Sequence, residues 1–197
     1  MVDILAPSLA HALILSACAE PCLYPGEHYK DRLRPQVKSA DSSVLPKASF
    51  GTWLAAGAEI LTIGKYKNGV TLIFIPSRDI FYFAAPNALL SQECPEGSIF
   101  VGQFVIDNEN PRILVFDTLK LRNVSCVDLP APNRYGELQK VSALFGPLCS
   151  VQWAGDLAVL TRDIRMKKFV VPHAIQGVMA LGLSPGRVTV FDSEAKK

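Results

Sequence analysis

The sequence predicts an α+β domain built mostly from antiparallel strands with a few helices. From about residue 70 onward, short runs rich in β-branched and aromatic residues recur, and turns containing Pro, Asn or Gly separate them. A helical spacing of apolar residues interrupts these runs between about 133 and 145. The chain has 197 residues, of which 49% are hydrophobic and 19% charged, so it can bury a core without disulfides or metals.

The first 48 residues are expected to form an N-terminal helix and a connecting arm, ahead of one globular unit over 49–197. Apolar residues predict a short helix over 8–18, which prolines would close. Residues 26–47 are polar and rich in Lys, Arg and Ser, which is typical of a loop. A second helix is expected over 49–60.

Strands dominate the rest of the expected order. The segment Asn108–Pro111 reads as a turn between two of them. A helix is expected to open at Pro132-Asn133 and to end at Gly146-Pro147. The expected strands cover residues 70–75, 79–83, 99–107 and 112–119, a short stretch within 121–127, and then 151–160, 167–171, 175–181 and 187–191.

Composition and cysteine usage argue against several classes of protein. A net charge of +2 does not indicate a general nucleic-acid binder. The five cysteines are odd in number and scattered, unlike those of a disulfide-framed secreted domain, so an intracellular location is expected. Paired zinc-ligand spacing is missing, and no apolar run reaches the ~18–20 residues that span a membrane. We therefore expect no metal, no cofactor and no membrane contact.

Several short segments, taken in order, carry a resemblance to a known family. They are Lys65–Gly69, Val101-Gly102-Gln103, Phe116-Asp117, Gln176-Gly177 and Arg187-Val188-Thr189. Together they resemble motifs of the covalent nucleotidyltransferases, which comprise messenger-RNA guanylyltransferases and DNA or RNA ligases. Those motifs are Lys-x-Asp-Gly, Asp-Gly-Glu, an aromatic-Asp pair, Glu-Gly and Lys-x-Lys. The resemblance spans about residues 60–191 and implies the fold of that family.

The departures from these motifs concern the residues that do the chemistry. Glutamine replaces glutamate at both Gln103 and Gln176, and the upstream motif reads Tyr66-Lys67-Asn68-Gly69, with lysines on either side of the expected nucleophile. Covalent transfer needs an unprotonated lysine, and the metal needs carboxylate oxygens. Glutamine keeps the shape of glutamate without its charge. The resemblance therefore implies a degenerate, non-catalytic form, similar to the cap-binding domain of snurportin.

The same resemblance supplies candidate ligand-binding residues. Phe116 would lie against a purine base, the glutamines would contact ribose or base, and the lysines would meet phosphate. Each also has a purely structural alternative, such as core packing or a solvated turn. Trp53 and Trp153 could stack on a methylated base, or pack in the core. The full candidate set is Lys65, Lys67, Gly69, Gln103, Phe116, Gln176 and Arg187.

Three functional hypotheses follow from these residues. The first is a non-catalytic domain that binds a nucleotide, an RNA end or an RNA cap. The second is an assembly module with a closed pocket, which binds a protein partner through its N-terminal region. The third is an active nucleotidyltransferase with relocated catalytic residues. A pocket lined by Lys, Arg and aromatic residues favours the first, whereas filling by Phe104 or Met179 favours the second.

Overall fold

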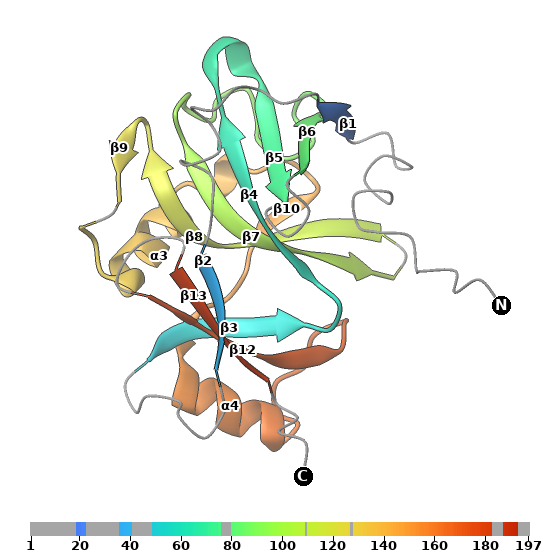
Figure 1. The fold of residues 1–197 in the computed structure, drawn as a ribbon, viewed down its shortest axis with the longest axis vertical. Helices are drawn as coiled ribbons and strands as arrows, with labels where there is room; N and C mark the ends of the chain where they lie inside the picture. The colour runs from blue at the N-terminus through green and yellow to red at the C-terminus, as the bar shows by residue number, and fades with distance from the viewer. Residues whose placement is uncertain are drawn as a thin grey trace, which may run out of the picture.

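The computed structural model describes residues 19–22, 36–40, 49–75, 80–108, 110–126, 128–182 and 187–192. Within them the chain forms two sheets, the larger one above the smaller one in Figure 1. The larger sheet has the order β1 (Ala19–Cys22), β6 (Ile80–Ala84), β5 (Thr71–Ile75), β4 (Glu59–Lys65), β7 (Ile99–Asp107), β8 (Asn110–Leu121) and β10 (Cys149–Val151), with β9 (Val124–Ser125) paired to β8. The smaller sheet has the order β11 (Gly155–Asp156), β3 (Phe50–Ala55), β12 (Ile175–Leu181), β13 (Arg187–Asp192) and β2 (Gln36–Ala40).

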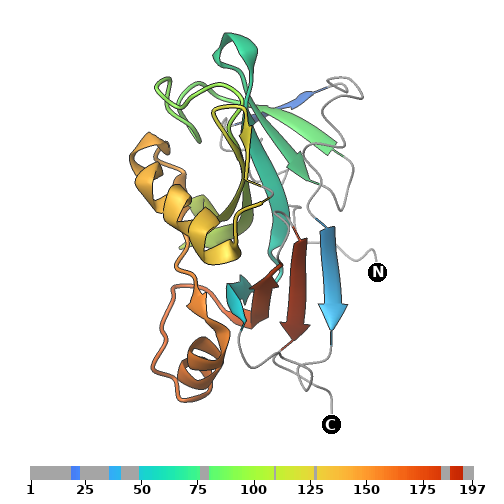
Figure 2. The ribbon, with the colours of Figure 1, turned by 90° about the vertical axis from the view of Figure 1, so that its left-hand side faces the viewer.

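Most strand pairs are antiparallel, as the sequence predicts. The parallel pairs among the described strands are β10 with β8 and β13 with β2. Helix α3 (Ala131–Lys140) packs on β8, and α4 (Leu157–Arg165) packs on β3 and β12. Short 3-10 turns cover Lys67–Gly69 and Ser142–Leu144. In the view of Figure 2 both helices lie to the left of the sheets, with β13 and β2 on the right.

Three apolar clusters fill this architecture. The first packs α3 and the 88–94 loop against one face of the larger sheet. The third packs α4 against the smaller sheet. The second lies between the sheets, and we call it the inter-sheet cluster. Its members are Leu54, Phe74, Phe81, Ile99, Val101, Phe116, Leu119, Ala131, Met179, Leu181 and Val190.

Several sequence-based expectations are confirmed. Strands β5, β6, β7, β8, β12 and β13 lie where strands were expected. Helix α3 begins where the helix was expected, but it ends at Lys140 and not at Gly146, and a 3-10 turn follows it over Ser142–Leu144. The expected short strand within 121–127 is reduced to the two residues of β9. Strands β5 and β6 form the expected antiparallel pair.

The helix expected over 49–60 is wrong, because these residues form β3 and the start of β4. β3 is paired on both sides, by β11 and by β12, and is almost entirely buried. A strand buried on both faces loses the alternation that identifies a strand in sequence. Gly57, with a φ of +70°, lies in the turn that separates β3 from β4.

Three further expectations need correction. The strand expected over 151–160 is interrupted: Val151 ends β10, Gly155–Asp156 form the short β11, and α4 begins at Leu157. The Asp156 side chain accepts hydrogen bonds from the backbone N–H groups of Ala158 and Val159 and so caps the helix there. The segment 167–171 is not a strand, since Lys167 adopts a left-handed φ of +55° just after α4. The loop expected over 26–47 contains β2, which pairs with β13. The helix expected over 8–18 lies outside the described residues.

Candidate functional site between the two sheets

Gln103, at the position of the family's second acidic residue, is completely buried between the sheets. Its Oε1 accepts a hydrogen bond from the backbone N–H of Ala55 at 2.9 Å. Its Nε2 donates to Trp53 O at 3.0 Å and to Gln152 Oε1 at 2.7 Å. Because one partner is a backbone N–H and another a backbone carbonyl, the orientation of this amide is unambiguous. Both protons of the amide are used within the fold.

Gln152 extends this network across the smaller sheet. Its Nε2 donates to Trp53 O and to Thr52 Oγ1, both at 2.7 Å. The Thr52 hydroxyl in turn donates to Trp153 O. Gln103, Gln152 and Thr52 are all buried, so this neutral network ties β7 to β3 without any charge.

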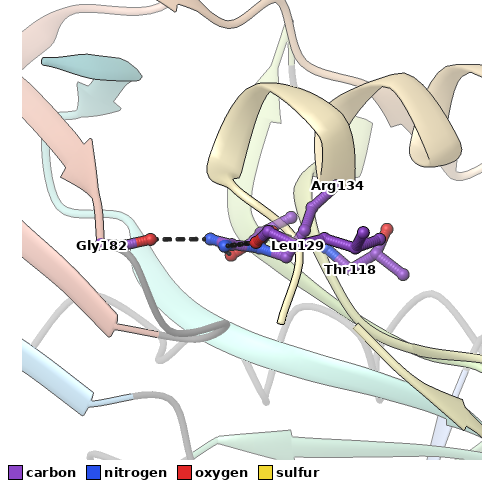
Figure 3. Close-up of polar contacts among 5 residues, drawn as sticks. Thr118, Leu129, Arg134 and Gly182 are labelled. Atoms are coloured by element: carbon purple, nitrogen blue, oxygen red, sulfur yellow. Dashed lines mark hydrogen bonds and ion pairs between the residues drawn. The ribbon is translucent and has the colours of Figure 1, made fainter. Parts of the chain in front are cut away.

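An ion pair forms the second buried polar network. The Asp117 carboxylate accepts hydrogen bonds from Arg134 Nε at 2.8 Å and from Arg134 Nη2 at 3.0 Å. Both side chains are fully buried. The guanidinium also donates to the backbone carbonyls of Leu129 and Gly182, as Figure 3 shows. Asp117 additionally accepts from the Thr118 N–H. This bidentate pair joins β8, α3 and the residue after β12, and charge-assisted bonds of this geometry are strong.

A third polar chain lies at the far end of β7. Trp53 Nε1 donates to His173 Nε2 at 2.9 Å, and His173 Nδ1 lies 2.9 Å from Asp107 Oδ1. Since the indole can only donate, Nε2 must accept, and the imidazole proton is on Nδ1 facing Asp107. His173 is thus a neutral tether between the two sheets, and the sequence gives no signal for this role.

The structure does not bring the upstream lysines to Gln103. Gln103 pairs with Ile60, and Lys65 lies five residues further along β4, a distance of roughly 17 Å at the rise of a strand. The buried Lys65 donates from Nζ to Ser91 O at 3.1 Å. Lys67 and Gly69 are exposed in the turn between β4 and β5, at the top of Figure 1. Gly69 has a φ of +72°, which explains the glycine there without a ligand.

The segment that does lie against both glutamine strands is Leu54–Gly57. Ala55 N–H bonds Gln103, and Leu54 pairs with Gly177 of β12. This segment ends at Gly57, two residues before β4 begins, and its first residue is the buried Leu54. Gln176 lies in a bulge of β12 beside it and is exposed.

Within the described part of the chain, the other candidate residues do not gather around one cavity. Phe116 is fully buried in the inter-sheet cluster, together with Met179. Both side chains fill the space between the sheets, and Phe104 is buried in the cluster beside α3. Arg187 is the first residue of β13, where its backbone pairs with Gln36. The described residues therefore place Gln103 and Phe116 between the sheets and the lysines elsewhere.

Thiols and metal ligands add no reactive group to this region. Burial raises the pKa of the thiols of Cys94, Cys126 and Cys149, which keeps them protonated, and burial also raises the pKa of Tyr135. Within the described ranges, no cluster of three His, Cys, Asp or Glu side chains could hold a metal ion. A search of the same residues for a helix able to cross a bilayer found none.

Sequence reasoning missed Gln152, Arg134 and His173. Arg134 had a usable signal, because it lies four residues before Leu138 on the buried side of a predicted helix. A lone cation on an apolar face indicates a buried partner. Gln152 and His173 had no comparable signal, since their partners lie 99 and 120 residues away at Trp53.

Two solved structures of DNA ligases have a similar fold. The fold resembles a mycobacterial DNA ligase D complexed with ATP and MES, at a TM-score of 0.56 and 14% sequence identity, over 83% of this chain and 61% of that chain. It also resembles the ligase domain of LigD from M. tuberculosis, at a TM-score of 0.55 and 15% identity, over 82% of this chain and 60% of that one. This chain thus spans about three fifths of those structures.

No family model and no curated protein sequence matches the chain. Its likeness is therefore one of fold. That fold is α+β with mostly antiparallel sheets, and the two similar structures are a DNA ligase D and a LigD ligase domain.

Proposed function

We propose that this chain is a non-catalytic binding module built on the nucleotidyltransferase fold, in which the space between the sheets serves as core. The observation that carries this proposal is the hydrogen bonding of Gln103. Its two amide protons meet Trp53 O and Gln152 Oε1, which are both acceptors. A glutamate there would present oxygen to oxygen, so the position needs an amide and cannot supply a carboxylate to a metal.

The residues near Gln103, where a nucleophilic lysine would be needed, support the same proposal. Leu54–Gly57 is the segment that meets both glutamine strands, and Leu54 packs in the inter-sheet cluster. Lys65 and Lys67 lie roughly 17 Å or more along the sheet from Gln103. A lysine at that distance cannot attack a phosphate held by the glutamine strands, because covalent transfer requires contact.

Incubation of the full chain with ATP or GTP, each with Mg²⁺ or Mn²⁺, tests the loss of transfer. Intact-mass spectrometry should show an unmodified chain under every condition, while a DNA ligase treated in parallel gains one nucleotide. A lysine–nucleotide adduct on this chain would refute the proposal and support the active-enzyme hypothesis.

The filled inter-sheet space favours the assembly module among the non-catalytic hypotheses. Phe116 and Met179 occupy that space with the other members of the inter-sheet cluster. A partner would then bind on the outside of the domain, and the region before residue 49 remains our proposed contact for a protein partner. The buried, free thiols of Cys94, Cys126 and Cys149 fit an intracellular location.

Binding of a nucleotide, RNA end or cap without transfer is the second candidate. It is favoured by the likeness to a ligase domain solved with ATP and by the exposure of Gln176 and Lys67. Calorimetry with ATP, GTP, a methylated cap analogue and a short capped RNA, with and without Mg²⁺, separates the two candidates. Metal-independent binding that Gln176→Ala weakens, and that the exposed control Gln139→Ala leaves intact, would establish the second candidate over the first.

A further inference from the structure

The two tryptophans, equivalent as stacking candidates in the sequence, differ sharply in the fold. Trp53 is 6% exposed and its indole N–H bonds His173, so it is unavailable to a ligand. Trp153 is 45% exposed. Its ring lies over Gly155, where an added Cβ would come within 2.6 Å of the indole. Phe169 contacts it at a centroid distance of 6.3 Å. Trp153 is therefore a supported but open aromatic platform.

A cluster of cations adjoins this platform. Four exposed cations precede Phe169 in the chain, at the end of α4 or just beyond it: Arg162, Arg165, Lys167 and Lys168. Asp163 is the one carboxylate within 162–168, and it pairs with Arg162. Cations in the last turn of a helix complement its dipole, which accounts for Arg162 and Arg165. It does not account for the two lysines beyond the helix or for the exposed indole.

The turn that follows α4 is centred on Lys167. Its φ of +55° is a left-handed conformation in which glycine is the usual residue after a helix. A lysine is less stable than glycine in this conformation. Its N–H bonds Ile164 O, and the N–H of Lys168 bonds Asp163 O, so the turn is well formed despite that cost. These hydrogen bonds, with that of the Phe169 N–H to Asp163 O, fix the backbone of the two lysines and of Phe169 against the end of α4.

Exposed apolar side chains surround the same segment. Val170 is 85% exposed and Met166 is 54% exposed. Cations interleaved with an open aromatic ring match the requirements of single-stranded nucleic acid, because the backbone needs positive charge and every base offers a face for stacking. An acidic peptide would use the lysines but would gain little from a flat indole.

We infer that Trp153, Phe169 and the cations of residues 162–168 form a docking surface for single-stranded nucleic acid. We call it the α4 surface. It lies on the α4 side of the smaller sheet, at the bottom of Figure 1. It is separate from the inter-sheet cluster. The inference therefore goes beyond the proposed function and does not depend on whether the space between the sheets is filled.

Fluorescence anisotropy of a labelled 12-nucleotide oligouridine, titrated with the full chain at several salt concentrations, tests the α4 surface. Trp153→Leu should weaken binding at least about fivefold, because stacking of a base on an aromatic ring is lost. Trp153→Phe should retain most of the affinity. The double variant Lys167→Gly/Lys168→Gln should lower the slope of log affinity against log salt by about 1.4, since two phosphate contacts are removed.

The controls distinguish lost binding from lost folding. Lys167→Gly relieves a left-handed lysine, so the double variant should unfold at the same urea concentration as wild type or a higher one. Lys140→Gln removes another exposed lysine, on α3, and should leave affinity unchanged.

Equal binding by wild type and the double variant would overturn the inference, as would failure of wild type to bind. Competition by polyglutamate as strong as that by oligouridine, with no effect of Trp153→Leu, would assign the surface to an acidic protein instead. None of these results bears on nucleotide transfer, which the mass measurement tests separately.

Discussion

The ion pair of Asp117 with Arg134 and the amide pair of Gln103 with Gln152 stabilise the same sandwich by different chemistry. Both networks are buried and both reach from the larger sheet to the smaller one or to its end. Asp117 stands where the family resemblance keeps an acidic residue, and Gln103 stands where the resemblance loses one. The difference is the partner: Asp117 has the guanidinium of Arg134, whereas Gln103 has an amide and backbone groups.

This comparison explains which carboxylate the fold retains. A buried carboxylate is tolerated when a cation and further hydrogen bonds compensate its lost hydration, and Arg134 does this by donating to both carboxylate oxygens of Asp117. At Gln103 the surrounding atoms demand two donors, which an amide offers and a carboxylate lacks. The Asp117 carboxylate is thus compensated within the fold, and its contacts account for it without a ligand.

Breaking the ion pair should have the largest effect. Arg134→Met leaves Asp117 buried without its cation, so we expect the free energy of unfolding to fall by about 3–5 kcal/mol. Urea denaturation followed by circular dichroism measures it. The double variant Asp117→Asn/Arg134→Met should lose less stability than the sum of the two single variants, because it contains no buried carboxylate without a cation. A loss below about 1 kcal/mol for Arg134→Met would show that the pair does not support the fold.

Restoring the family's glutamate should be the next largest effect. Gln103→Glu places a carboxylate against Trp53 O and Gln152 Oε1, so we expect a loss of about 2–4 kcal/mol at neutral pH. The matched control is Gln176→Glu, which restores the other family glutamate at an exposed position and should change stability by less than about 0.5 kcal/mol. Equal effects of the two substitutions would contradict the contrast drawn here.

The neutral tether at His173 should matter less than either network. Trp53→Phe keeps an aromatic ring but removes the N–H that bonds His173 and part of the buried indole, so we expect a loss of about 1–2 kcal/mol in urea denaturation. Trp153→Phe is the matched control, because Trp153 is largely exposed, and it should be close to neutral. A neutral Trp53→Phe would show that His173 finds another donor.

The buried thiols are a further kind of buried polar group, and they ionise only at alkaline pH. Burial raises the pKa of Cys149, so the folded chain holds this proton more tightly than the unfolded chain. The contribution to stability is therefore complete below the unfolded pKa of about 8.5 and is lost as the pH rises above it. Stability measured from pH 7 to 10 should decline, and Cys149→Ala should decline less steeply. Parallel curves would show that Cys149 does not titrate on unfolding.

Local patterns sufficed for the elements whose signals are local. Strand β5 follows from a β-branched run that ends at a proline, and α3 follows from apolar residues at helical spacing. Strand β3 could not be predicted in this way. Its residues show no alternation because both faces are buried, and its pairing partners β11 and β12 lie about 100 and 125 residues later.

The candidate site divides along the same line. That glutamine replaces glutamate at Gln103 and Gln176 can be read directly from the sequence, and so can the chemical consequence. The packing of the two sheets decides the rest. It buries Gln103 and hydrogen-bonds it to Ala55 and Gln152, whereas Gln176 stays exposed. Residue identity fixes which groups can carry charge, whereas burial and the geometry of neighbours decide whether a group binds a ligand or holds the fold together.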